Sequence, residues 1–385
     1  MKKMSKLQFK ILKKKWNARV WQITLNGITL TTPVFMPVGT RATIKGLILD
    51  LLRDPKYIGA LPAINLILAN TFHLYLRPGD EIVKQAGWLH QFENRDQLIL
   101  TDSWWYQVFS LWLGQKDRPN NTSQRPFAKV SEQWVKFRSP YDGSEHRFTP
   151  EKVIDIQANL WSDIMMVLDV CSPAWISAKK YYQQMQLTHR RAKRAFDYFL
   201  PQYDSIRWVL FPIVQWGTDH QLRKESLDYL KQFAIDWIAV GGVSVWESKE
   251  LVRDIVSFIG PQLPEDKPRY LMGVWTHQDI VHAVANGFDM FDCVLPTRLG
   301  RHGLAMTSQW NIKLSNAQYK NDFTSLDPEI DSFTSRHFTK AYLHHLIRTD
   351  EILGGILLSL HNIVYLHHLV NKLQQQILDD KEIIC

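Results

Sequence analysis

The sequence predicts an α/β fold, a (β/α)8 TIM barrel, and three observations support this. Short apolar runs alternate with amphipathic stretches from residue 34 to about residue 304, as strands and helices do around a parallel sheet. These apolar runs are eight in number, which is the strand count of a TIM barrel. The length of 385 residues also suits one large barrel. We therefore expect a single domain over 1–385, with the barrel at about 30–304 and a C-terminal helical subdomain at about 305–385.

Each expected element has a local signal in the sequence. The eight strands are predicted at residues 34–39, 65–70, 97–102, 164–170, 209–215, 237–243, 270–274 and 290–296. Helices are predicted at 150–160, 178–199, 220–233, 249–259 and 277–287, and Pro150 lies just inside the first of them. An Asp-Gly turn within 136–149 predicts a β-hairpin inserted in the barrel. The polar segment 113–127 predicts a loop, and 336–380 predicts closing helices.

Composition limits the class of partner and compartment. The 46 Lys and Arg residues exceed the 38 Asp and Glu residues, and the net charge of +8 suits a polyanion such as RNA. Cys171, Cys293 and Cys385 are too scattered for a disulfide framework, so a reducing cytoplasm is expected. No apolar run approaches the roughly 20 residues of a membrane span, and we expect no membrane association. The basic segment 1–16 lacks signal-peptide features and is predicted to be a solvated lead-in.

Polar residues gather where the predicted strands end. The carboxyl ends of barrel strands face the active site, and here they carry Asp102, Asp169, Gln215, Gly241-Gly242 and Asp292. Two carboxylates on separate strands can act as nucleophile and as acid/base in a glycosyl-type displacement. Asp169 and Gln215 offer the acceptor and the donor that hydrogen-bond a purine edge. Any one of these aspartates can equally serve as a cap or a loop residue.

Eight motifs in order over nearly the whole chain resemble the tRNA-guanine transglycosylase family of the bacterial type. They are TPVFMPVGTRATIKGL (32–47), LANTFHLYLRPG (68–79), LTDS with YQVFSL (100–111), VKFRSPYDGS (135–144), LPEDKPRYLMGV (263–274), GFDMFDCVLPTR (287–298), TSQ with KNDF (307–323) and LLSLHN (357–362). The resemblance implies a barrel enzyme that replaces the wobble guanine of certain tRNAs with a deazaguanine base. It also implies a homodimer in the cytoplasm.

The resemblance assigns roles to individual residues. Asp292 resembles the nucleophile that attacks the ribose, and Asp102 resembles the group that deprotonates the incoming base, after the nucleotide is extruded from its loop. Base contacts are implied at Ser103, Tyr106, Asp169, Cys171, Gln215, Gly241, Gly242, Val245 and Met272. Contacts with the anticodon loop are implied at Gly273, Thr276, His277, Gln278, Asp279, Thr297, Arg298 and Arg301. Cys171 and Val245 match the pattern that accepts 7-aminomethyl-7-deazaguanine, although Cys171 also suits an inert core position.

The chain departs from the family at the expected zinc site. Family members bind zinc through a Cys-x-Cys-x-x-Cys run and a later histidine, whereas this chain has Ile330, Ser332 and Ser335 and keeps only His361. Isoleucine and serine cannot replace thiolate ligands of tetrahedral zinc. We therefore expect no zinc and no other cofactor.

A second departure is that tryptophan stands where the family has glycine. The positions are Trp21, Trp88, Trp104, Trp105, Trp134, Trp161, Trp216, Trp237, Trp246, Trp275 and Trp310. Adding these eleven to the 18 glycines gives 29, close to the roughly 27 expected from average composition. One hypothesis is that UGA codons read as glycine were translated as tryptophan.

Three interpretations of function stay open. The first is an active base-exchanging enzyme. The second is an impaired tRNA-binding paralogue whose base pocket is blocked by genuine indoles at Trp104, Trp105 and Trp216. The third is a barrel glycosidase, which shares the two carboxylates but leaves the base-edge residues and the basic segment 297–301 unexplained.

Overall fold

The computed structural model describes residues 7–103, 128–170, 177–203, 208–233, 235–243, 247–274 and 276–383. The chain divides into two compact units. The first comprises Met1–Leu7 and Ala69–Met272, and the second comprises Gln8–Leu68 and Gly273–Cys385. The predicted loop at 113–127 lies outside the described residues.

Parallel strands form the centre of the first unit. β11 (Val209–Phe211), β10 (Ile164–Met166) and β6 (Leu98–Asp102) lie side by side in this order. The next strand is β5 (Leu66–Asn70), of which the last two residues belong to this unit. β12 (Ile213–Val214), β13 (Ile238–Val240) and β14 (Arg269–Leu271) form a second parallel run. Nearly all of these residues are buried, which explains why the sequence shows continuous apolar runs rather than alternation. Each strand overlaps a segment predicted to be one, but β14 begins one residue earlier than predicted, and the single strand predicted at 209–215 is divided into β11 and β12.

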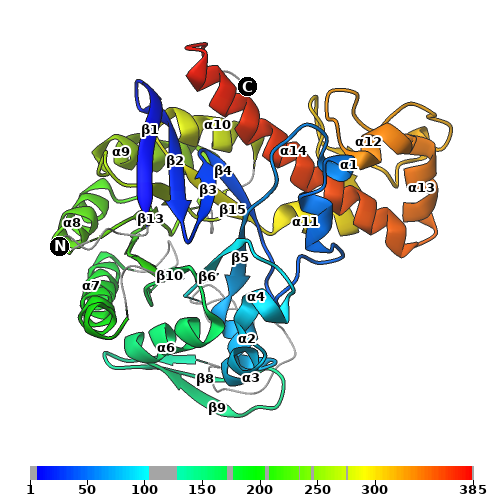
Figure 1. The fold of residues 1–385 in the computed structure, drawn as a ribbon. Helices are drawn as coiled ribbons and strands as arrows, with labels where there is room; N and C mark the ends of the chain where they lie inside the picture. Colours follow the sequence, from blue (N-terminus) through cyan, green and yellow to red (C-terminus); the bar gives the residue numbers. More distant parts are fainter. Residues whose placement is uncertain are drawn as a thin grey trace. The chain divides into compact units, whose positions relative to one another are not determined.

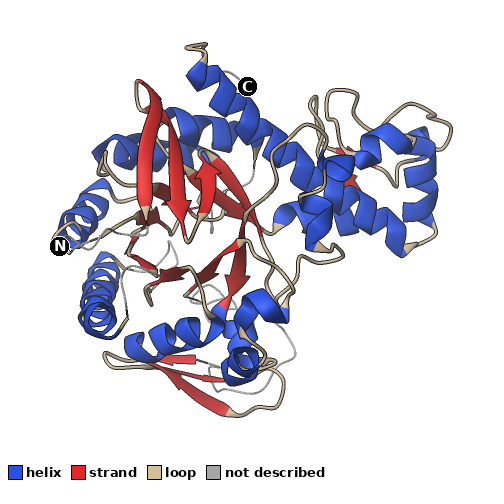
Figure 2. Ribbon diagram, viewed as in Figure 1, coloured by secondary structure: helices blue, strands red, loops and turns tan. Residues whose placement is uncertain are grey.

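Helices follow these strands in the first unit, as Figures 1 and 2 show. They are α2 (Thr71–Leu76), α3 (Asp80–Gln85), α4 (Trp88–Phe92), α6 (Pro150–Leu160), α7 (Ala178–Gln202), α8 (His220–Leu230), α9 (Lys249–Ile259) and the short 3-10 helix η2 (Gly260–Gln262). The starts of α6 and α8 are capped by Thr149 and Asp219, whose side chains accept N–H groups of the first turn. The sequence therefore encodes the helix starts locally.

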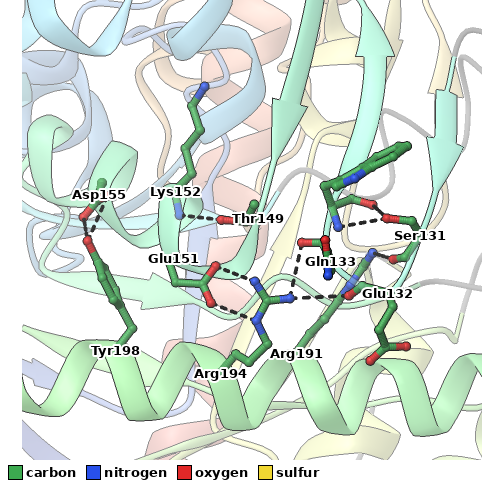
Figure 3. A network of polar contacts seen from close by, with 11 residues as sticks. Ser131, Glu132, Gln133, Thr149, Glu151, Lys152, Asp155, Arg191, Arg194 and Tyr198 are labelled. Carbon is green, nitrogen blue, oxygen red and sulfur yellow. Dashed lines mark hydrogen bonds and ion pairs between the residues drawn. The ribbon is translucent and has the colours of Figure 1, made fainter.

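A small antiparallel sheet covers one side of α6 and α7. β8 (Val135–Arg138) pairs with β9 (Glu145–Phe148) across the Asp-Gly turn, and β7 (Ala128–Val130) pairs with β8. Figure 3 shows polar contacts of α7 near this sheet: Arg194 forms two hydrogen bonds with Glu151 of α6, and Arg191 donates to the Ser131 carbonyl, in the turn between β7 and β8, at 2.8 Å. Helix α7 therefore contacts both α6 and the turn between β7 and β8.

The second unit begins with an antiparallel sheet that the sequence analysis missed. β1 (Gln8–Lys15) pairs with β2 (Ala18–Leu25), and β2 pairs with β3 (Ile28–Thr31). Residues 8–15 are therefore a strand and not a lead-in, although, as predicted, most of them are exposed to solvent. The lysines of this segment hid the strand, because β1 draws its order from pairing with the buried β2 rather than from an apolar face of its own.

Two parallel strands and a long helix form the core of the second unit. β15 (Met290–Cys293) pairs in parallel with β4 (Val34–Pro37), and Val38 bridges to Leu68. The remaining elements are η1 (Leu49–Leu52), α1 (Pro55–Ile58), α10 (His277–Ala285), α11 (Leu295–Arg301), β16 (Leu304–Ala305), β17 (Ile312–Lys313), η3 (Ala317–Tyr319), α12 (Phe333–His337), α13 (Lys340–Arg348) and α14 (Ile352–Leu378).

Helix α14 organises the packing of this unit. It contacts α11, α12 and α13, and Figure 1 shows it in red beside them. A Cβ on Gly300 of α11 would lie 2.5 Å from the Ser359 nitrogen, so only glycine allows this close approach. By length and composition α14 could cross a membrane, a feature that the sequence analysis overlooked, but 72% of its most apolar window is buried inside the structure. That burial is typical of a core helix.

Several tryptophans occupy backbone conformations that favour glycine. Trp88, Trp161 and Trp216 have φ angles of 67°, 60° and 108°. Trp161 ends α6 in the left-handed conformation, where glycine is the usual residue. Trp16, which the sequence comparison did not assign to a glycine position, also has a positive φ of 53° in the turn between β1 and β2. The backbone thus independently marks three of the described positions that the family pattern marks as glycine.

Candidate active site

Asp102 ends β6 and is held by the junction of β5 with α2. Its Oδ2 accepts a hydrogen bond from the Asn70 side chain at 2.7 Å, and its Oδ1 accepts one from the Thr71 N–H at 3.2 Å. Asn70 also caps α2, because its Oδ1 accepts the His73 N–H at 3.0 Å. The carboxylate of Asp102 is therefore fixed in orientation by residues that the sequence analysis did not select.

Asp169 is a buried carboxylate that joins two other strand ends. Its exposed fraction is 4%. Its Oδ1 accepts the Ser103 hydroxyl at 2.9 Å, and its Oδ2 accepts the Gln215 side-chain N–H. Burial raises the pKa of Asp169 to about 6, although both hydrogen bonds and the nearby Arg191 guanidinium oppose the shift. The structure thus brings three predicted base-binding residues together.

Gly241 and Gly242 lie directly against Gln215. A Cβ on Gly242 would lie 2.3 Å from the Gln215 Oε1, and a Cβ on Gly241 would lie 3.0 Å from the Gln215 Nε2 and 3.3 Å from the Met272 sulfur. Any larger residue would displace the carboxamide. Six of the predicted base-binding residues therefore lie next to one another in the first unit: Ser103, Asp169, Gln215, Gly241, Gly242 and Met272.

Asp292 lies on β15 in the second unit. Its Oδ1 accepts the Gly273 N–H at 2.9 Å, which orients the carboxylate. Its neighbour Cys293 is buried, and burial raises the pKa of that thiol to about 12. Cys293 is therefore a neutral packing residue, while the carboxylate of Asp292 is only partly buried.

The residues predicted to contact RNA fall into two groups. Arg298 and Arg301 of α11 are exposed. Thr297 is buried and its hydroxyl donates to the Val294 carbonyl at 3.3 Å, while His277 hydrogen-bonds the Tyr365 hydroxyl at 2.7 Å. The Thr276 side chain caps α10 by accepting the Asp279 N–H. The arginines thus present charge to solvent, whereas the others mainly hold the local backbone.

Two further cations join these arginines. Arg41 and Lys45 are exposed, and Lys45 has a lowered pKa because of partial burial and the positive charges of Arg301, Arg41 and Arg298. Four mutually repelling cations, Arg41, Lys45, Arg298 and Arg301, form what we call the basic cluster. Such a cluster suits the phosphate backbone of RNA.

We expect Arg301→Ala and Arg298→Ala to weaken tRNA binding in a salt-dependent way. Each variant should reduce the slope of log Kd for tRNA against log salt concentration by about 1. The reason is that a variant with one phosphate contact fewer releases fewer counterions from tRNA when it binds. Electrophoretic titration at several salt concentrations measures this slope. The matched control is Arg190→Ala, since Arg190 is exposed but paired with Glu132. An unchanged slope in both cluster variants would contradict the assignment.

The raised pKa of Asp169 predicts that base binding depends on pH. The ionised carboxylate is the form that accepts N–H groups of a purine, and its pKa is about 6. Affinity for guanine should therefore be full above that pH and fall as pH drops through it. Because Arg191 favours the ionised form, Arg191→Gln should move this midpoint upward, and Asp169→Asn should abolish the dependence. Calorimetric titration with guanine across this pH range tests both; a flat wild-type profile would contradict the prediction.

The expected zinc position holds a hydrogen-bonded cluster of neutral groups. The fully buried His361 contacts the Ser332 hydroxyl at 2.9 Å and the Ser335 hydroxyl at 3.3 Å through Nδ1, and its Nε2 lies 2.8 Å from the Met306 carbonyl. Since a carbonyl only accepts, Nε2 carries the proton and Nδ1 accepts from a serine. Burial lowers the pKa of His361 to about 4. These donors and acceptors are already used within the protein and do not fit zinc.

Restoring the missing thiols should restore metal binding. The triple variant Ile330→Cys, Ser332→Cys and Ser335→Cys places three thiols in the sequence run before His361, where thiolates bind zinc. We expect this variant to purify with zinc and the parent chain to purify without it, as measured by atomic emission spectroscopy. One equivalent of zinc in the parent chain would contradict the expectation.

Three predicted site residues, Tyr106, Cys171 and Val245, lie outside the described residues. The same holds for four tryptophans at glycine positions, Trp104, Trp105, Trp246 and Trp275. Trp216 is described: it is 1% exposed, and its ring packs edge-on against Tyr181 with the centroids 5.7 Å apart.

Comparisons with known proteins agree over nearly the whole chain. The sequence profile of the family described as Queuine tRNA-ribosyltransferase matches residues 14–382. Curated proteins of that name are similar to this chain in Ruminiclostridium cellulolyticum, with 41% identity over 98% of this chain and 96% of the relative. The relative in Caldanaerobacter subterraneus is 42% identical over 98% and 95% of the two chains, and that in Francisella tularensis subsp. novicida is 42% identical over 97% and 95%.

Proposed function

Because this chain belongs to the queuine tRNA-ribosyltransferase family, we propose that it replaces the wobble guanine of tRNA with 7-aminomethyl-7-deazaguanine through a covalent intermediate on Asp292. As a member of this family, the chain is a glycosyltransferase that performs tRNA-guanine transglycosylation in queuosine biosynthesis. Its substrates are tRNA and a guanine-type base, and its fold is TIM-barrel-like.

The observation that carries the finer proposal is the buried Asp169 with its Ser103 and Gln215 partners. A carboxylate and a carboxamide at the ends of neighbouring strands provide an acceptor and a donor, and the edge of a guanine-type base carries the complementary groups. A sugar-cleaving enzyme has no need of this pair. The cluster therefore favours base exchange over the glycosidase interpretation.

In the proposed chemistry, a carboxylate oxygen of Asp292 attacks the ribose anomeric carbon and forms a bond to it. The bond to the guanine nitrogen breaks, and guanine leaves with the electron pair and takes up a proton from Asp102, which is left ionised. The incoming base then gives its ring N–H proton to Asp102 and attacks the same carbon, which releases Asp292. The hydrogen bonds from Asn70 and Thr71 keep the Asp102 carboxylate oriented for this transfer.

The proposal includes the architecture and assembly that the resemblance implies. These are a closed (β/α)8 barrel at about 30–304 with the 136–149 hairpin inserted in it, a helical subdomain at about 305–385, and a cytoplasmic homodimer that binds the tRNA anticodon loop. No cofactor takes part in the reaction. Base contacts at Tyr106, Cys171 and Val245 and RNA contacts at Gly273 and Gln278 belong to the same proposal.

Incorporation of labelled guanine into tRNA tests the proposed function. The assay is run on the chain as printed and on a variant with glycine at the eleven tryptophan positions of the family pattern. We expect exchange by the glycine variant, and inhibition of it by 7-aminomethyl-7-deazaguanine. If both versions bind tRNA but neither exchanges guanine, the proposed function is rejected.

A further inference from the structure

Arg223 of α8 lies beneath the loops that carry the predicted base-binding residues. It is fully buried. Its guanidinium donates to three backbone carbonyls, those of Gly217 at 2.7 Å, Gly241 at 3.0 Å and Gly242 at 3.0 Å. A buried cation that binds three carbonyls in two loops fixes the orientation of the peptide groups to which they belong.

The fixed carbonyls determine where the next N–H groups point. In a trans peptide the C=O and the N–H of the following residue point in opposite directions. Because Arg223 holds the carbonyls of Gly241 and Gly242, the N–H groups of Gly242 and Val243 point away from the guanidinium. Among the described residues neither of these two N–H groups donates to a protein acceptor, whereas the Gly241 N–H donates to the Val214 carbonyl at 2.9 Å.

These two N–H groups belong to the segment that lies against Gln215 and, through it, Asp169. The Gln215 side chain packs on the Cα atoms of Gly241 and Gly242, and its Nε2 binds Asp169. Gly242 also has a φ of 62°, a conformation that glycine adopts without strain. The segment therefore offers backbone donors beside the acceptor formed by Asp169.

We propose that Arg223 is a positioning residue that makes the base site select a ring carbonyl: it turns the Gly242 and Val243 N–H groups toward the oxygen of 6-oxo purines and 7-deazapurines. This inference rests on the proposed function. Guanine-type bases carry an acceptor at this position, whereas adenine-type bases carry an amino donor. The guanidinium also polarises the two peptide groups, which strengthens their N–H groups as donors.

The test compares guanine with 2-aminopurine, which keeps the amino group but lacks the carbonyl oxygen and the N1 hydrogen. Because the N1 hydrogen contacts Asp169 in the proposal, the Arg223 variants described below show how much of the preference is due to the carbonyl. Binding of each base to the full-length protein is measured by calorimetry, and exchange into tRNA is measured in parallel. The wild-type protein should bind guanine at least about tenfold more tightly than 2-aminopurine, since the analogue leaves buried donors unpaired. Equal binding of the two bases by the wild-type protein would overturn the inference without any variant.

Variants then show whether Arg223 causes this preference. In Arg223→Met the preference should fall to less than about threefold through loss of guanine affinity, with the KM for tRNA unchanged; Arg223→Lys should be intermediate. A purely structural role would weaken both bases equally and leave their ratio intact, which would overturn the inference. The binding ratio is independent of turnover, so absence of exchange in the wild-type protein would reject the proposed function separately.

Arg269 provides a matched control in the same unit. It is 3% exposed and also donates to three backbone carbonyls, those of Gly260, Leu263 and Pro264. These carbonyls precede β14, and none of them belongs to a predicted base-binding residue. Arg269→Met should lower the melting temperature but keep the guanine preference. Loss of the preference in this variant as well would show that it follows general destabilisation, which contradicts the role of Arg223.

Discussion

Replacing Asp292 with alanine is expected to abolish base exchange while the protein still folds and binds tRNA. In the proposed mechanism this carboxylate forms the covalent bond to ribose, and the loss of a nucleophile typically lowers turnover by roughly 10⁴-fold or more. The cost to folding should be small, about 1 kcal/mol for the hydrogen bond from the Gly273 N–H, because the Asp292 side chain is only partly buried. Labelled-guanine incorporation measures the activity, and denaturing electrophoresis of the enzyme with tRNA shows whether the covalent intermediate forms.

Two comparisons sharpen this test. Cys293→Ser changes the next residue of β15, a neutral buried thiol that accepts the Leu295 N–H, and this variant should keep its activity. Asp102→Asn should block transfer to the incoming base, yet it leaves the nucleophile in place. If Asp292→Ala still forms a covalent tRNA adduct, another residue is the nucleophile and the assignment is wrong.

Replacing Trp216 with glycine is expected to raise the free energy of unfolding if the position evolved for glycine, and to lower it if the indole is genuine. If the site evolved for glycine, the change relieves about 1–3 kcal/mol of strain at the φ of 108°. It also removes a buried indole N–H that has no hydrogen-bond partner among the described residues, a penalty of about 1–3 kcal/mol. If the indole is genuine, the change instead opens a cavity and costs about 3–5 kcal/mol. Denaturant unfolding of the printed chain and the variant measures the difference.

Trp161→Gly is the companion variant at the end of α6, where the left-handed φ of 60° favours glycine by about 1–2 kcal/mol. Trp310→Gly is the control, because Trp310 is 65% exposed and its φ is not positive, so a change below about 0.5 kcal/mol is expected. Destabilisation at both 161 and 216 would support the paralogue with genuine indoles.

Mass spectrometry of the native protein, or the presence of UGA codons in the gene, decides the same question directly. Trp16 should be inspected together with the eleven positions, because its φ is also positive.

The strands of the first unit could be predicted because their chemistry is local. β10 and β11 are apolar throughout and bounded by polar turns, and their strand ends carry the residues on which the site prediction depended. β1 could not be predicted in this way. Its order depends on pairing with β2, and a run of lysines gives no apolar periodicity to detect.

The site was only partly predictable for the same reason. Asp102 and Asp169 stand out at strand ends. Asn70 does not, because its hydrogen bond to Asp102 joins residues 32 positions apart, and the sequence around Asn70 indicates only a helix cap. Arg223 lies on an amphipathic helix where an arginine normally suggests a solvent-facing charge. Its burial against glycine carbonyls of two loops is visible only once the chain is folded.

The serine and histidine cluster of Ser332, Ser335 and His361 alters how this protein would respond to chemical stress. Thiolate zinc sites fail when oxidants attack the sulfur or when chelators withdraw the metal. Here hydroxyl and imidazole groups hydrogen-bond directly to one another and to the Met306 carbonyl, so neither agent finds a target in this cluster. If zinc is absent as predicted, the integrity of this region does not depend on the cell's metal supply or thiol balance.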